Sequence, residues 1–154
     1  MKPTLADFAV KAEIVTRIRR LTPSSPRQWG KMTVDQMVCH AIDAKLMAMG
    51  EHTVADKSNI FTKNFVRLMA LRAPMQWPHG IKTVPEFDQV AGAGTPPTMF
   101  EADRAQLIAV VERFAASKRD FTFAPHPMFG QMSEWEWMRW GFLHADHHLR
   151  QFGL

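Results

Sequence analysis

The last part of the chain holds two histidines whose spacing suits a metal ion. His144 and His148 are four residues apart in a segment with helical periodicity, so their rings lie one turn apart on the same face. This spacing also serves helical zinc sites in metalloproteases, but no glutamate follows His144, which excludes a protease of that kind. Seven histidines in 154 residues give such a pair by chance about 0.3 times. The pair alone is therefore weak evidence.

The surroundings of the pair strengthen it. Trp137, Trp140 and Gly141 mark the same stripe of the helix as facing the core, and His40 adds an imidazole near the inward face of an earlier helix. Buried imidazoles need partners, which can be a metal ion, a carboxylate, a backbone carbonyl or water. Three imidazoles would leave an open coordination position, as catalytic sites do. An all-imidazole set suits zinc or nickel first, and also iron or copper.

Other side chains are candidates for orienting or lining this site. Asp43 is one turn beyond His40 and can orient an imidazole through its free nitrogen, or lie at the surface. His147 lies beside the stripe, and its pairing with His144 is also geometrically allowed. His126 precedes the last helix and can lean over the mouth of the site or decorate a loop. The candidates for pocket wall or plain core packing are Trp137 and Trp140.

Several helices must position these residues. Hydrophobic periodicity predicts helices over residues 4–20, 33–49, 58–71, 98–114 and 133–152. Three of them open on the pattern of a capping box, at Thr33–Gln36, Thr98–Glu101 and Ser133–Glu136. Residues 73–97 hold five prolines and three glycines, which indicates a long loop of a kind that is often functional. The pattern predicts an all-α, single-domain four-helix bundle over residues 1–154, with a long loop and a short extra helix.

Composition excludes several classes of protein. The single cysteine, Cys39, excludes an intramolecular disulfide and a zinc site built from several thiolates, and we expect it to be a small core residue. No apolar run approaches the ~20 residues that cross a bilayer, and the first residues do not resemble a signal peptide. We therefore expect a cytoplasmic protein without a membrane partner. The net charge of +4 comes without any nucleic-acid-binding motif, so nucleic acid is not an expected partner.

Two longer stretches resemble a known family. They are Trp29-Gly-Lys-Met-Thr-x-x-Gln-Met-x-x-His40 and a C-terminal run that begins with His126-Pro-x-Phe-Gly and ends with His144-x-Asp-His-His148-Leu-Arg-Gln-Phe-Gly. They are similar to an uncharacterised bacterial branch of the DinB-like superfamily, whose members are up-down-down-up four-helix bundles, often dimeric, with a three-histidine site for a divalent ion. The resemblance covers both ends of the chain and the helical layout, but not the middle. It implies a homodimer in which His40, His144 and His148 are the ligands and His147 lies at the pocket rim.

The resemblance also implies a function. Better-known relatives are S-transferases that use mycothiol or bacillithiol, and maleylpyruvate isomerases. We therefore expect a metal-dependent transferase or hydrolase that acts on a small molecule, with the ion activating a thiol or water. The alternative is a non-catalytic protein that binds a metal or small ligand in a stress response. In either case, we expect metal affinity to decrease once the pH is lower than about 6, because imidazoles with an ordinary pKa of ~6.5 then become protonated.

Overall fold

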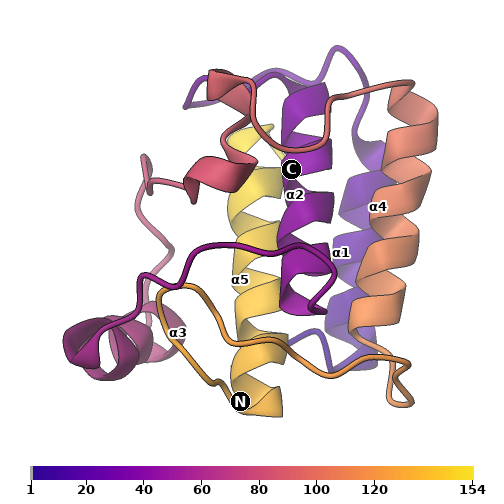
Figure 1. Ribbon diagram of the computed structural model, residues 1–154. Coiled ribbons are helices and arrows are strands. Elements are labelled where there is room, and N and C mark those ends of the chain that lie inside the picture. The colour runs from indigo at the N-terminus through magenta and orange to yellow at the C-terminus, as the bar shows by residue number, and fades with distance from the viewer. Residues whose placement is uncertain (1) are drawn as a thin grey trace.

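The computed structural model describes residues 2–154 and is helical (Figure 1). The long helices are α1 (Phe8–Arg20), α2 (Val34–Ala48), α4 (Phe100–Phe114) and α5 (Glu134–Gln151). The shorter elements are the π-helical turn η1 (Thr62–Val66), which continues into α3 (Arg67–Arg72), and the 3-10 turns η2 (Pro85–Phe87) and η3 (Gln89–Ala91). Residues 2–154 form no strand beyond an isolated bridge between His126 and Gly130. The predicted all-helical class is confirmed.

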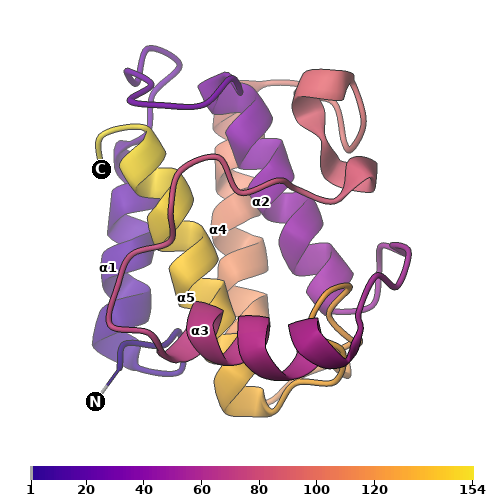
Figure 2. The same ribbon diagram turned by 90° about the vertical axis from the view of Figure 1, so that its left-hand side faces the viewer.

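The four long helices make the bundle. Both α1 and α2 pack against α4 and α5. In Figure 2, α1 and α5 run upwards while α2 and α4 run downwards. Gly141 leaves room on α5 for the side chains of Phe114 and Leu5, because a Cβ at this position would lie 2.6 Å from the ring of Phe114 and 2.9 Å from Cδ1 of Leu5. The core between the helices is apolar, and its largest fully buried side chain is Trp137.

Two of the three predicted capping boxes are present. Thr33 and Gln36 cap α2 reciprocally, and Ser133 and Glu136 cap α5 in the same way. These caps satisfy backbone N–H groups that have no partner inside the helix. Both helices that carry the candidate ligands therefore begin where local sequence predicts.

The prediction of a third capping box, at Thr98–Glu101, is wrong. The cap position of α4 is Met99, which makes no side-chain hydrogen bond. Thr98 lies one residue too early, and both its backbone N–H and its hydroxyl donate to the carboxylate of Asp103, each over 2.8 Å. The start of α1 also differs from the prediction, because Asp7 accepts from the N–H groups of Ala9 and Val10 and the helix begins after it.

Two connecting segments and the end of α5 meet at one end of the bundle, opposite to the connection between α4 and α5. Residues 21–33, the C-terminal end of α5 and residues 85–95 all lie at the upper end in Figures 1 and 2. We call residues 85–95, which include η2 and η3, the strap. The ring of Trp29 stacks on that of His79 with 3.9 Å between centroids, so the first connection contacts the long loop 73–97.

Helix α3 and η1 lie outside the four-helix bundle, and α3 packs against α5 (Figure 2). The segment predicted at residues 58–71 is helical from Ile60 to Arg72. It and the residues after it expose large apolar side chains, namely Ile60, Phe61, Phe65, Leu68, Met69 and Met75. We call these six residues the α3 face. Within residues 2–154, no helix has the length and apolar character needed to span a membrane.

Candidate metal centre

Helices α2 and α5 bring three histidines together inside the bundle. His40 comes from α2, and His144 and His148 come from α5, which packs directly against α2. One nitrogen of each ring lies within 4.8 Å of the others. All three side chains are buried, with exposed fractions of 4–8%. Among residues 2–154, this is the one group of three potential ligands that converges on a common point.

The rings of His40 and His148 are each oriented by a hydrogen bond. Nδ1 of His40 lies 3.2 Å from the carbonyl oxygen of Phe87, and Nδ1 of His148 lies 3.0 Å from Oε1 of Gln151. Because both partner oxygens only accept, each Nδ1 carries the proton and each Nε2 keeps its lone pair. This is the arrangement in which outer partners fix metal-binding histidines.

Gln151 is itself held in place. Its Nε2 donates to the carbonyl oxygen of Trp29, which fixes the orientation of the amide and turns Oε1 towards His148. Gly30 permits this approach, since a Cβ there would lie 2.5 Å from Nε2 of Gln151, and its φ of +80° favours glycine. The i,i+3 spacing of His148 and Gln151 indicates from the sequence that these two side chains can meet on one face of a helix. The carbonyl of Phe87 gives no such indication.

The third ring, that of His144, has a different environment. It stacks on Trp140 with 4.9 Å between centroids, and its buried Nδ1 has no hydrogen-bond partner within residues 2–154. A buried polar atom without a partner needs an explanation. A metal ion shared with His40 and His148 would supply the missing partner.

Burial keeps these imidazoles neutral. It lowers the pKa of His40 and lowers those of His144 and His148 well below the ordinary value of 6.5, with nearby positive charges as a further cause. Only neutral imidazole coordinates a metal, so the three rings are in the binding form at neutral pH. Protons therefore compete with the metal at lower pH than an ordinary histidine pKa indicates. The pH at which metal affinity is lost should therefore lie below the value of about 6 that the sequence suggests.

His147 contacts the site from the side. Its ring lies 5.2 Å from that of His148 and packs against Trp29 and Trp77, at 5.9 and 6.2 Å between centroids. Its buried Nδ1 has no partner within residues 2–154, and burial lowers its pKa to about 4. The connections that carry Trp29 and Trp77 thus cover His147, next to the ligand His148.

His126 and Trp137 belong to the core. Trp140 packs against both His144 and His126, and His126 is not among the three histidines that converge. Nδ1 of His126 accepts from the backbone N–H groups of Met128 and Phe129, and burial lowers its pKa to about 3. Its role is to order the turn before α5. Trp137 is fully buried and stacks on Phe123.

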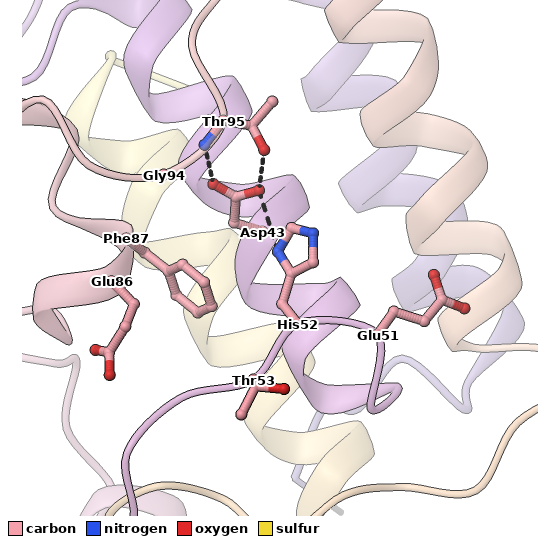
Figure 3. Close-up of a pocket in the computed structure, with 8 residues that line it drawn as sticks. All are labelled: Asp43, Glu51, His52, Thr53, Glu86, Phe87, Gly94 and Thr95. Atoms are coloured by element: carbon pink, nitrogen blue, oxygen red, sulfur yellow. Dashed lines mark hydrogen bonds and ion pairs between the residues drawn. The ribbon is translucent and has the colours of Figure 1, made fainter.

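Asp43 is buried, but its carboxylate makes no hydrogen bond to His40. It accepts from the backbone N–H and the hydroxyl of Thr95, and lies 3.5 Å from Nδ1 of His52 (Figure 3). These residues line a pocket of about 330 Å³ that also includes Phe87. Cys39 is a buried free thiol, as expected for a core residue, and burial is the main cause that raises its pKa to about 12.

Lys45 is a functional candidate that the sequence did not reveal. It is fully buried in α2, with Nζ 5.0 Å from the ring centroid of Trp140 and 5.7 Å from that of Phe114. It makes no ion pair within residues 2–154, and burial lowers its pKa to about 7. A lysine between Ala44 and Leu46 carries no sequence signal for such burial. Its charge is also among the causes that lower the pKa of His144.

Fold and site together define a helical-bundle protein with a buried three-histidine cluster that has the donor set of a metal centre. A family model described as "Protein of unknown function (DUF1569)" matches residues 3–153, and the chain belongs to this family. No curated protein and no solved structure matches the chain. Similarity to the DinB-like superfamily therefore remains a resemblance carried by the motifs.

Proposed function

We propose that the protein is a metal-dependent enzyme that transfers a group to, or hydrolyses, a small molecule. The observation that carries the proposal is the convergence of His40, His144 and His148 within 4.8 Å in a buried site with neutral rings. The donor set suits a divalent ion, zinc or nickel before iron or copper. Bound there, such an ion would lower the pKa of a thiol or water and supply a nucleophile at neutral pH.

The chain's own residues supply the remaining parts of this proposal. Phe87 and Gln151 hold two of the rings in the binding tautomer. Lys45 and His147 are buried basic groups near the cluster, and an enzyme of this kind needs such groups to accept or return a proton. Trp29 and Trp77 shield His147 from water, which strengthens electrostatic interactions in the site. A cytoplasmic location and a small thiol as co-substrate are part of the same proposal.

The other candidate is a metal-binding protein without turnover, as in a stress response. Near-complete burial of all three rings favours it, since substrate must reach the ion for catalysis. Neither the pocket beside Asp43 nor a second pocket, which lies between α3 and Glu136 of α5, is lined by these histidines. Access to an exchangeable coordination position therefore separates the two functions.

We expect small thiols to bind the metal-loaded protein. After substitution with cobalt or nickel, adding a thiol such as 2-mercaptoethanol should produce a sulfur-to-metal charge-transfer band, because three imidazoles leave a position open and the ion's charge uncompensated. The band should be absent in His148→Ala. A spectrum that stays unchanged with thiols and carboxylates alike would remove the enzymatic proposal in favour of the non-catalytic one.

We also propose that the protein is a homodimer that buries the α3 face. Its six apolar side chains are about half to four-fifths exposed, and the rings of Phe61 and Phe65 stack on each other. Large exposed apolar patches mark interaction sites. Light scattering over a range of concentrations should give twice the chain mass for the wild type. Introducing Phe61→Glu with Phe65→Glu should give the monomer mass.

Phe8→Glu is the matched control for this pair of substitutions. Phe8 is 80% exposed but lies on α1, outside the α3 face, so its substitution should leave the mass unchanged. A wild-type protein that stays monomeric at high concentration would refute the dimer.

A further inference from the structure

We infer that Asp43 is a positioning residue of the metal centre, which fixes the strap whose Phe87 carbonyl orients His40. This inference rests on the proposed metal site. The inference goes beyond the proposed site because it makes the orientation of the His40 ring depend on the carboxylate of Asp43, which does not contact that ring. The chain of contacts runs from Asp43 to Thr95, along the strap to Phe87, and from Phe87 to His40.

The contact between Asp43 and Thr95 pins one end of the strap to α2. Asp43 is fully buried, and its two oxygens accept from the N–H of Thr95 over 2.8 Å and from its hydroxyl over 2.6 Å (Figure 3). Hydrogen bonds to a buried carboxylate are charge-assisted and stronger than neutral ones. Asp43 and His40 are three residues apart on α2, so the strap is tied to the same face that carries the ligand.

Further hydrogen bonds make the strap a closed unit. Nε2 of Gln89 donates to the carbonyl oxygen of Thr95 over 2.8 Å, and Nε2 of Gln36 donates to that of Gln89 over 3.1 Å. Gln36 belongs to the capping box of α2, so the strap is tied to the helix at its start and again at Asp43. With both ties in place, the carbonyl of Phe87 has a defined direction towards His40.

Gly94 shows how close the strap lies to Asp43. A Cβ at Gly94 would lie 2.8 Å from Oδ2 of Asp43 and 2.8 Å from Nε2 of Gln89. Next to this contact is the 330 Å³ pocket, so one side of the strap faces open space instead of packed side chains. This end of the strap is therefore held in place mainly by its hydrogen bonds to Asp43.

The chain contains a matched control for Asp43. Asp103 accepts from the N–H and the hydroxyl of Thr98 over 2.8 Å each, and it is also buried. The chemistry is the same, and Asp103 also accepts from Sγ of Cys39 over 3.9 Å, but it makes no hydrogen bond to the strap. Substituting either aspartate by asparagine should cost similar folding stability. Only Asp43→Asn should disturb the metal site.

The test compares metal affinity with stability in these two variants. We expect Asp43→Asn to weaken cobalt binding about tenfold, the lower end of the effect of outer partners of metal ligands, and to alter the cobalt spectrum. Asp103→Asn should leave affinity within about twofold while lowering the unfolding midpoint similarly. Equal effects of both variants on affinity, or no effect of either, would overturn the inference.

A pair of glycines tests the strap itself, because a Cβ at Gly94 would meet Asp43 and Gln89 and would also lie 3.4 Å from Cα of Phe87. Gly92 and Gly94 have φ of +80° and +82°, so alanine strains the backbone similarly at both, but a Cβ at Gly92 meets nothing within 4 Å. Gly94→Ala should reduce metal affinity and Gly92→Ala should not. Equal losses would mean that backbone strain in the strap is the cause and would count against Asp43.

A measurement without metal separates this inference from the proposed function. Nitrogen-15 shifts of His40 in the metal-free protein report whether Nδ1 carries the proton, as the contact with Phe87 requires. We expect this tautomer in the wild type and in Asp103→Asn, and a mixture in Asp43→Asn. If the wild type binds no metal, the proposed function fails, and these shifts still decide the role of Asp43. Identical shifts in all three proteins would overturn it.

Discussion

Replacing any one of the three clustered histidines by alanine should abolish stoichiometric metal binding while the protein stays helical. Each of His40, His144 and His148 would supply one of three protein ligands, so losing one should weaken binding by more than the ~10–100-fold that outer partners contribute. Binding is measured by titration and by metal analysis of protein purified without an affinity tag. Helical content is measured by circular dichroism.

Two further variants provide losses of metal affinity with which this result can be compared. Gln151→Leu removes the acceptor for Nδ1 of His148 but keeps all three ligands, so an intermediate loss of about 10–100-fold is expected. His79→Ala removes an exposed imidazole that stacks on Trp29 but supplies no ligand, so affinity should fall by less than in Gln151→Leu. If the triple alanine variant still bound one metal per chain with wild-type affinity, the ion would lie elsewhere and the assignment of the site would be wrong.

Replacing Lys45 by methionine should stabilise the metal-free protein strongly at neutral pH. Burial lowers the pKa of Lys45 from 10.5 to about 7, and no carboxylate compensates its charge within residues 2–154. A shift of this size corresponds to a penalty on the order of 5 kcal/mol, as an upper value, which is reached at about pH 7 and below, where the folded chain also carries the proton. Methionine has a similar length and no charge to desolvate.

The pH dependence of this effect follows from the direction of the shift. Between about pH 7 and 10.5 the unfolded chain binds the proton of Lys45 and the folded chain does not, so wild-type stability should rise with pH in this window. The advantage of Lys45→Met should be largest at about pH 7 and below, and should vanish towards pH 10.5. Urea unfolding at several pH values measures both.

An exposed lysine provides the control for this experiment. Lys118 is exposed, so Lys118→Met should change the free energy of unfolding by less than about 0.5 kcal/mol at every pH. Destabilisation by Lys45→Met at pH 7 would contradict the expectation. It would mean that the folded protein compensates a charged ammonium at this position.

Sequence by itself determined the features that depend on local periodicity. Four residues make roughly one helical turn, so the spacing of His144 and His148 put both rings on one face of α5 before any contact was known. The caps at Thr33 and Ser133 follow from side chains that bond backbone groups three residues away. The cap expected at Thr98 failed because a carboxylate five residues on, Asp103, competed for the same hydroxyl.

Only the tertiary structure decided which groups meet these side chains. The partner of Nδ1 of His40 is a backbone carbonyl 47 residues away, and backbone carbonyls have no signature in a sequence. Asp43 pairs with a threonine 52 residues away, along a strap whose path depends on packing against α2. Lys45 reads as a surface residue in isolation, yet α2 is surrounded so fully that its ammonium is buried. Local spacing thus places a side chain on a helix face, whereas its charge state and its partners depend on where distant segments of the chain pack.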